Sequence, residues 1–337
     1  MAPRRTTLGN SNVEINQLGL GLGSLSPFYG PAGTHEELLR FLDHAWEIGN
    51  RNWDTADAYG DSEDIIGKWF ALHPERRADI FLATKFGLKM APEEISINSS
   101  PEYCRQHCEL SLKRMGIECI DLYYVHRIDP VTPIEKTIEM MVQLKKEGKI
   151  KALGLSECHS STLRRAHAIH PISAIQVEYN PWSLEIEQAT SGHILDVAKE
   201  LNVSVFAYSP LSRGLLTGAI KSVSDLTPGD WRLRLQRFSP ENFNKNLVLV
   251  DTLKAISKRK GCTVAQLTLA WLMEQSPYVV PIPGTKRVVA LDENWGSNEV
   301  VLTPKDLEEV RKAVDAAGVA GDRDASALGS YLVSVPL

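Results

Sequence analysis

Eight short apolar or β-branched runs, each followed by a longer segment with helical character, constrain the fold of this chain more than any other feature. The runs read as nearly continuous apolar stretches, as parallel strands do when both faces of their sheet are covered. Eight strands alternating with helices predict an α/β fold, specifically a (β/α)8 TIM barrel with long loops at its C-terminal face. The expected strands cover residues 16–21, 52–56, 80–85, 120–126, 150–156, 174–180, 203–209 and 279–284.

The segments between the runs carry helix-start signals. Thr34 with Glu37 three residues later forms a capping box, and Thr132 before Pro133 predicts a cap followed by an N-terminal proline. No GxGxxG motif follows the first run, so a doubly wound dinucleotide-binding fold is the weaker interpretation.

The 337-residue chain contains no low-complexity linker, so we expect one barrel domain over residues 1–337, with a C-terminal tail at about 318–337. The segment 210–243 is rich in Gly, Ser, Pro and Arg. We interpret it as the long loop after the seventh strand, on the catalytic face of a barrel.

Composition narrows the classes of function. The net charge is -5, which argues against a nucleic-acid or membrane-surface partner, and no apolar run is long enough for a membrane span. Five scattered cysteines fit reduced thiols and a cytoplasmic protein. Cys104, His107 and Cys108 are close in sequence, but no second Cys/His pair completes a four-ligand set, so no metal site is predicted.

Polar residues mark the ends of three successive strands. Asp54 ends the second run, Lys85 the third and His126 the fourth, while Tyr59 lies on the loop after the second. Each alone also fits a structural role, such as a solvated lysine or a hydrogen-bonded core histidine. Together they should converge, because the C-terminal ends of barrel strands share one rim, where active sites are built. Lys85 after an apolar run is a poor place for an unpaired charge, and Asp54 is its natural partner.

Several stretches resemble the aldo-keto reductases, which are NAD(P)H-dependent carbonyl reductases on a (β/α)8 barrel. The resemblance covers residues 18–314 and is most similar to a branch with GLSE and RRAHAIHP that includes pyridoxal reductase-like and general aldehyde reductase-like members. The stretches that carry it are LGLGLGSLS, DTADAYGDSE, ATKFG, LYYVHRID, GLSE, IQVEYN, AYSPLSRGLLTG and IPGTKRVVALDEN.

The resemblance implies a catalytic tetrad of Asp54, Tyr59, Lys85 and His126. Tyr59 would be the general acid that protonates the carbonyl oxygen, helped by the Lys85 ammonium, which stabilises a phenolate. Asp54 would keep that ammonium charged and aimed, and His126 would orient the substrate oxygen. Asp57 is then expected to be a turn residue.

The resemblance also implies a nicotinamide cofactor site. Tyr208 matches the aromatic that stacks on the nicotinamide ring, and Ser156 and Gln176 match residues that hold its carboxamide. Lys286 and Arg287 suit a 2′-phosphate, which predicts NADPH in preference to NADH. The full set is Gly23, Ser24, Asp54, Ser156, Glu157, Gln176, Tyr208, Ser209, Leu211, Arg213, Gly284, Thr285, Lys286, Arg287, Glu293 and Asn294.

Two positions depart from the family pattern. Glu157 stands where many members carry asparagine, and a carboxylate accepts from an amide NH2 but cannot donate to the carboxamide oxygen. Ala290 stands where some members place another arginine near the adenosine phosphate, so the cofactor preference depends on Lys286 and Arg287.

The substrate pocket is expected to have aromatic walls, shaped by the loops 24–33 and 211–243 and by the tail 318–337. Few charges among such walls suit an aldehyde or ketone with an apolar or aromatic body. The expected lining residues besides Tyr59 are Phe28, Tyr29, Trp53, Trp182 and Trp231.

Two other interpretations stay open. The potassium-channel β-subunits resemble the same family and bind nicotinamide cofactor while serving a partner. A barrel hydrolase could use Asp54 and Asp57 as paired carboxylates, although Lys85 and His126 would then lack a role. The sequence does not distinguish a monomer from a homo-oligomer.

Overall fold

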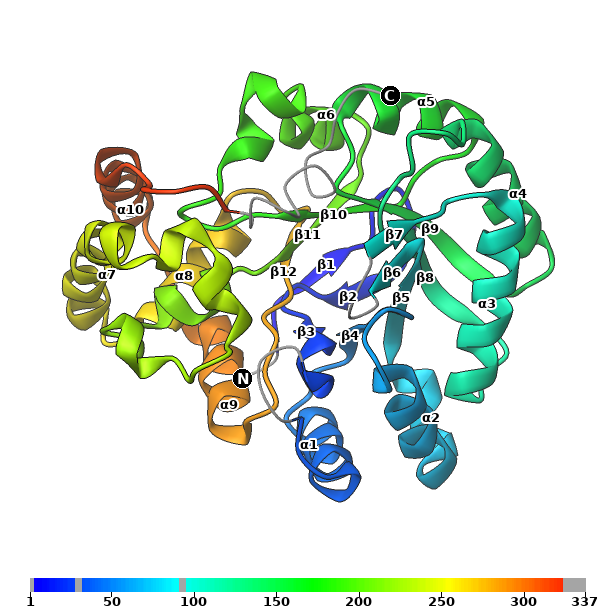
Figure 1. Cartoon of the computed structure of the whole chain (residues 1–337), viewed down its shortest axis with the longest axis horizontal. Helices are drawn as coiled ribbons and strands as arrows, with labels where there is room; N and C mark the ends of the chain where they lie inside the picture. Colours follow the sequence, from blue (N-terminus) through cyan, green and yellow to red (C-terminus); the bar gives the residue numbers. More distant parts are fainter. Residues whose placement is uncertain (1–2, 28–31, 91–94, 324–337) are drawn as a thin grey trace.

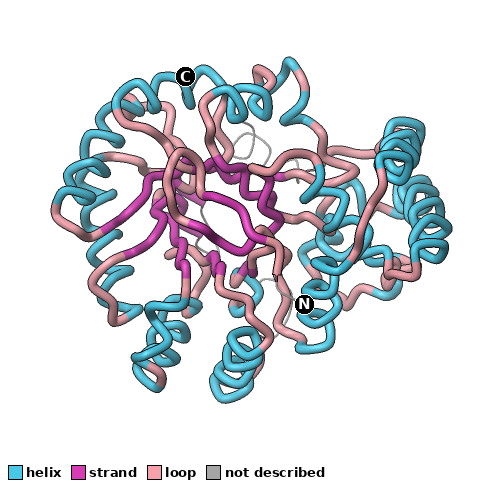
Figure 2. Tube along the Cα trace, turned by 180° about the vertical axis from the view of Figure 1, so that it is seen from behind, coloured by secondary structure: helices cyan, strands magenta, loops and turns pink. Residues whose placement is uncertain are grey.

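The structure, a computed structural model, describes residues 3–27, 32–90 and 95–323. Eight parallel strands form its central sheet, in the order β12-β11-β10-β9-β8-β5-β4-β3. Figures 1 and 2 show these strands at the centre of a ring of helices. The strands are β3 (Leu20–Gly21), β4 (Asn52–Asp54), β5 (Phe81–Phe86), β8 (Ile120–Val125), β9 (Ile150–Ser156), β10 (Ala174–Glu178), β11 (Ser204–Tyr208) and β12 (Val279–Pro281).

The first and last strands of this sheet meet and close it. Gly21 forms a parallel bridge with Gly284, and its N–H donates to the Pro283 carbonyl at 3.1 Å. The Gly19 N–H donates to the Pro281 carbonyl at 2.9 Å. The predicted (β/α)8 barrel is therefore confirmed.

Helices follow the barrel strands, and their starts test the predicted caps. Thr34 and Glu37 form the expected capping box at the start of α1. Thr132 does not cap α4, because the helix begins one residue later than predicted, with Pro133 as its N-cap and no side-chain cap hydrogen bond. The Val131 and Thr132 N–H groups donate to the Asp129 carboxylate in the preceding turn. The α-helices are α1 (His35–Glu47), α2 (Ser62–Leu72), α3 (Pro101–Met115), α4 (Ile134–Lys146), α5 (Ser160–Ile169), α6 (Ile194–Glu200), α7 (Pro240–Lys260), α8 (Val264–Glu274), α9 (Val288–Trp295) and α10 (Pro304–Ala317).

The loop after β11 contains short 3-10 turns and leads into α7 at Pro240. Its turns are η6 (Ser212–Thr217), η7 (Val223–Asp225), η8 (Trp231–Arg234) and η9 (Gln236–Phe238); elsewhere lie η1 (Gly23–Leu25), η3 (Pro74–Asp79), η4 (Glu185–Glu187), η5 (Ala189–Ser191) and η10 (Gly296–Glu299).

Two antiparallel hairpins lie outside the barrel sheet: β1 (Arg5–Thr7) with β2 (Glu14–Asn16), and β6 (Leu88–Met90) with β7 (Ile95–Ile97). The run expected as one strand at 16–21 is thus divided between β2 and β3. Leu8 and Ile15 of the first hairpin are buried with residues of the barrel interior, and the Gly9 N–H donates to Ser204 at the start of β11. The first hairpin therefore covers the N-terminal end of the barrel.

The larger apolar core lies between the strands and the helices. Trp53 is fully buried there, with its ring 4.9 Å from that of Trp69 in α2. Side chains alternate along a strand, so Trp53 points outward because Asp54 points into the barrel. This corrects the expectation that Trp53 lines the substrate pocket.

Candidate active site

The C-terminal ends of β4 and β5 carry a buried ion pair. Lys85 is fully buried and Asp54 nearly so, and the Lys85 Nζ lies 2.5 Å from an Asp54 carboxylate oxygen. The ammonium also donates to the Thr55 carbonyl at 2.7 Å. The other Asp54 oxygen accepts from the Gln176 amide at 2.7 Å. The predicted pairing of Asp54 with Lys85 is present in the structure.

The surroundings of this pair keep the ammonium charged. Burial alone would lower the pKa of Lys85, but its interactions with Asp54 and Tyr59 outweigh burial, so the pKa is raised. Burial raises the pKa of the Asp54 carboxyl, opposed by Lys85 and Gln176. The result is a fixed positive charge that faces a phenol.

Tyr59 reaches the same rim from a tight turn after β4. The Tyr59 N–H donates to the Ala56 carbonyl, and the Asp57 N–H donates to the Lys85 carbonyl, both at 3.1 Å. The Lys85 Nζ lies 5.0 Å from the centroid of the Tyr59 ring. The turn is therefore hydrogen-bonded to the residue whose side chain faces Tyr59.

His126 completes the cluster at the end of β8. Its ring meets the Tyr59 ring edge-on, with 5.7 Å between the centroids. Burial, and then the charges of Lys85 and Arg127, hold the pKa of His126 well below its ordinary value. The imidazole is therefore neutral at neutral pH, and its Nδ1 has no hydrogen-bond partner among the described residues.

Asp57 does not share a site with Asp54. Its carboxylate lies 2.6 Å from the His107 ring of α3, whereas Asp54 is held by Lys85 and Gln176. Two carboxylates with separate partners do not form the acid–base pair that the hydrolase interpretation needs, and Asp57 acts as the expected turn residue.

The next strand ends hold the residues expected around a nicotinamide. Ser156 ends β9 and its hydroxyl accepts from Arg127 at 3.2 Å. The Glu157 carboxylate accepts from the Glu178 N–H and from the Arg323 guanidinium, both at 2.9 Å. Burial opposes its ionisation, but Arg323 and Arg127 outweigh burial and lower the pKa of Glu157. Tyr208 ends β11, and burial raises its pKa well above the ordinary value, so its phenol stays neutral.

A cavity of about 500 Å3 lies between the loops after β3, β11 and β12. Its size is within the usual range for a small-molecule site. Expected residues that line it are Ser24, Ser209, Leu211, Arg213, Gly284, Thr285, Lys286, Arg287, Glu293 and Asn294, together with Ala290.

The chemistry of this cavity fits a phosphate-bearing ligand. Lys286 and Arg287 bring two cations to the N-terminus of α9, where backbone N–H groups and the helix dipole favour an anion. The Thr285 hydroxyl accepts from the Arg287 N–H at 3.1 Å, and the buried Ser24 hydroxyl has no partner within the described part of the chain. A buried hydroxyl without a protein partner is available to donate to a phosphate oxygen.

The structure also shows residues that were not predicted for the site. Arg232 lines the cavity and donates to the Arg213 carbonyl at 2.9 Å. The Arg213 guanidinium, expected at the cofactor site, forms two hydrogen bonds with Glu178 at 2.9 and 3.0 Å. Glu178 was detectable in the sequence, because a charge inside the apolar run IQVEYN needs a partner.

The expected aromatic walls are only partly described. Phe28 and Tyr29 lie outside the described residues. Trp182 is buried in the main core. The Arg213 guanidinium lies over the Trp231 ring, with its carbon 5.5 Å from the ring centroid. The pocket role of Trp182 and Trp231 stays a prediction.

Two kinds of feature are absent from the residues that the structure describes. No group of three or more His, Cys, Asp or Glu side chains there could hold a metal ion. No helix there is long and apolar enough to cross a membrane.

Comparison with solved structures agrees with the barrel. A glycerol dehydrogenase from Gluconobacter oxydans superimposes with a TM-score of 0.78 at 28% identity, covering 100% of this chain and 98% of the other. A thermostable aldo-keto reductase in complex with the inhibitor epalrestat gives a TM-score of 0.72 at 27% identity, covering 92% and 99%.

Sequence comparison is more specific. Aldo-keto reductase str7 from Strobilurus tenacellus is 45% identical over 332 residues, covering 98% of this chain and 97% of the relative. Aldo-keto reductase yakc [NADP(+)] from Schizosaccharomyces pombe is 45% identical over 329 residues, covering 96% and 95%. The Aldo/keto reductase family matches residues 17–315, from the strand that closes the barrel to its last helix. The chain therefore belongs to the aldo/keto reductase family.

Proposed function

We propose that this protein is an NADPH-dependent carbonyl reductase that converts an aldehyde or ketone to the alcohol, with Tyr59 as the general acid. The observation that supports this most is the buried Lys85 ammonium, fixed by Asp54 and Thr55 and facing the Tyr59 ring at 5.0 Å. A fixed positive charge beside a phenol stabilises the phenolate that remains after the proton leaves.

The residues of the rim divide the reaction between them. When bound, NADPH supplies the hydride that adds to the carbonyl carbon. The Tyr59 O–H gives its proton to the carbonyl oxygen, so that C=O becomes CH–OH, and solvent later reprotonates the phenolate. Neutral His126 donates an N–H to the same oxygen and orients it as negative charge develops there.

The cavity supports the choice of cofactor. Lys286 and Arg287 would hold a 2′-phosphate at the start of α9, and a relative that is 45% identical carries NADP(+) in its name. At the other end of the cofactor, the nicotinamide would be held by Ser156, Gln176 and Tyr208. The ionised Glu157 would accept from the carboxamide NH2. The aromatic lining predicted from the sequence would favour a carbonyl substrate with an apolar or aromatic body.

Fluorescence titration with NADPH and NADH, followed by a screen of aldehydes and ketones, tests the proposal. Tyr59→Phe should lower kcat by about a hundred- to ten-thousand-fold, because it removes the proton donor. Its Kd for NADPH should stay within about twofold of the wild-type value, because the ring remains. Full activity in this variant would assign the acid to another group, and absence of NADPH binding by the wild type would refute the reductase.

A further inference from the structure

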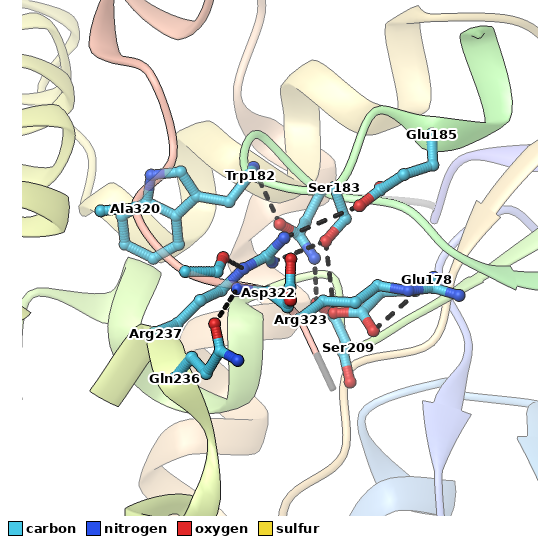
Figure 3. Close-up of polar contacts among 12 residues, drawn as sticks. Glu178, Trp182, Ser183, Glu185, Ser209, Gln236, Arg237, Ala320, Asp322 and Arg323 are labelled. Carbon is cyan, nitrogen blue, oxygen red and sulfur yellow. Dashed lines mark hydrogen bonds and ion pairs between the residues drawn. The ribbon is translucent and has the colours of Figure 1, made fainter. Parts of the chain in front are cut away.

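The chain returns to the active-site rim after its last helix. Residues 318–323 follow α10 and contact the N-terminal part of α7 and the turn η9. Figure 3 shows Ala320, Asp322 and Arg323 of this segment near Gln236 and Arg237 of η9.

Hydrogen bonds to α7 and η9 hold this C-terminal segment. The Ala320 N–H donates to the Asn246 side-chain oxygen at 2.9 Å, and the Asn246 amide donates to the Ala320 carbonyl at 3.0 Å. Arg237 donates to the Gly321 carbonyl at 3.3 Å, and the Asp322 N–H donates to the Gln236 side-chain oxygen at 3.1 Å.

Arg323, at the end of the segment, reaches two strand ends of the barrel. Its guanidinium lies 2.9 Å from a Glu157 oxygen, just after β9, and 3.9 Å from a Glu178 oxygen at the end of β10. All three side chains are buried or nearly so, with exposed fractions of 12% for Arg323, 5% for Glu157 and 0% for Glu178. A contact between residues 166 positions apart thus lies inside the rim.

The two glutamates depend on Arg323 to different degrees. Glu178 already has two hydrogen bonds from Arg213, at 2.9 and 3.0 Å. Glu157 accepts a backbone N–H at one oxygen and the Arg323 guanidinium at the other. Since a buried carboxylate needs a counter-charge, Glu157 is the residue that would be affected most by loss of Arg323.

The backbone of Glu157 adds to this dependence. Its φ is +47°, in the left-handed region that a glutamate rarely adopts. Strained positions persist only where surrounding contacts hold them, and here the two carboxylate contacts do so. Glu157 directly follows Ser156 of the proposed nicotinamide end, and both Glu157 and Arg323 act electrostatically on the Tyr208 phenol there.

We propose that Arg323 is a positioning residue for the nicotinamide end of the cofactor site. Its guanidinium neutralises the Glu157 carboxylate and orients it. The C-terminal segment, which lies outside the barrel, thereby holds a residue at the active-site rim in place. The inference rests on the proposed function, because it requires a nicotinamide cofactor at this rim.

The test separates the two halves of the cofactor. NADPH and 2′-phospho-ADP-ribose, which lacks the nicotinamide, are titrated against wild type, Arg323→Gln and Arg323→Lys, with thermal stability recorded for each. Arg323→Gln should raise the Kd for NADPH by about tenfold or more, while the Kd for 2′-phospho-ADP-ribose stays within about twofold of the wild-type value. Arg323→Lys keeps the charge and should lie between wild type and Arg323→Gln. Arg259→Gln, which removes an exposed pair with Glu309 in α10, is the matched control and should bind both like wild type.

A double-mutant cycle keeps the inference testable if Arg323→Gln is unstable. Glu157→Gln/Arg323→Gln removes both charges of the pair, and its loss of NADPH affinity should be smaller than the sum of the two single losses. Additive losses, equal losses for both ligands, or unchanged NADPH affinity in Arg323→Gln would overturn the inference and leave the reductase intact. A wild-type protein that binds 2′-phospho-ADP-ribose but not NADPH, or neither ligand, would refute both.

Discussion

At the scale of single residues, the Lys85 ammonium determines what the rim can do. Removing an ammonium from water is unfavourable by several kcal/mol, so it stays charged only where opposite charge and acceptors surround it. Asp54, the Thr55 carbonyl and Tyr59 supply those contacts. The groups that keep Lys85 charged therefore include the phenol that the charge would activate.

Lys85→Met should destabilise the protein and abolish reductase activity. Breaking a buried pair leaves Asp54 with an uncompensated charge, which lowers the free energy of unfolding by about 3–5 kcal/mol. Lys85→Met/Asp54→Asn should regain part of that stability without regaining activity, because the introduced amide is uncharged and its oxygen can still accept from Gln176. Urea denaturation and NADPH-dependent turnover measure the two effects. A Lys85→Met protein as stable as wild type would contradict the buried pair.

His126 should make the stability of the fold depend on pH. Burial lowers its pKa in the folded state below the ordinary 6.5, so between the two values the unfolded chain binds the proton and the folded chain does not. Its contribution is fully favourable above pH 6.5 and is lost as the pH falls from 6.5 toward the folded-state pKa. As the pH falls from about 7.5 to 5, the melting temperature of the wild type should fall more steeply than that of His126→Gln. Thermal melts of both proteins at pH steps of about 0.5 measure this difference. Parallel curves would contradict a buried neutral imidazole.

At the scale of elements, strand ends explain why much of the site could be predicted. Parallel register brings Asp54 beside Ala83 and Lys85 beside Tyr124 across neighbouring strands. A polar residue at the end of an apolar run therefore marks the rim, and order along the chain becomes order around the barrel. The outward direction of Trp53, toward α2, could also have been inferred from the sequence, since an inward Asp54 requires an outward neighbour.

Other elements had no local signal. The strands β1 and β2 are three residues each, too short for periodicity to identify, and their hairpin is defined by contacts with strand starts far along the chain. Arg323 lies in a tail without strong periodicity, and only the folded chain brings it to Glu157. The sequence predicted that Asp54, Lys85 and His126 converge at strand ends, and it missed Arg323 and the hairpin, which are placed by long-range packing.

The N-terminus of α9 should determine the preference between cofactors. Lys286→Ala and Arg287→Ala each remove a cation from the cavity, and each should reduce the ratio of NADPH to NADH affinity by about tenfold, since hydrogen bonds to charged groups are the strong ones. NADH affinity should change little, because NADH lacks the 2′-phosphate. Lys305→Ala removes an exposed lysine from the first turn of α10, outside the cavity, and should leave the ratio unchanged. Equal losses for both cofactors would place the phosphate elsewhere.

At the scale of the whole molecule, the seam between β3 and β12 joins the two ends of the sheet and forms part of the cofactor cavity. Ser24 follows β3, and Gly284 and Thr285 follow β12, so the cavity is lined from both sides of the seam. A Cβ at Gly21 would lie 2.8 Å from the Ile282 carbonyl oxygen, which is backbone and cannot rotate away. The close approach of the two strands thus requires glycine at this position.

Gly21→Ala should therefore weaken the fold and cofactor binding together. Forcing the strands apart should lower the free energy of unfolding by about 1–3 kcal/mol, as overpacking of a tight contact does. NADPH affinity should fall with it, because the residues on the two sides of the cavity move apart. Gly284→Ala, on the opposite side of the same bridge, places its Cβ 3.3 Å from the Gly21 oxygen and should lose less stability. Denaturation curves and NADPH titrations of the two variants decide the point: a Gly21→Ala protein with wild-type stability and affinity would mean that the seam does not constrain the barrel.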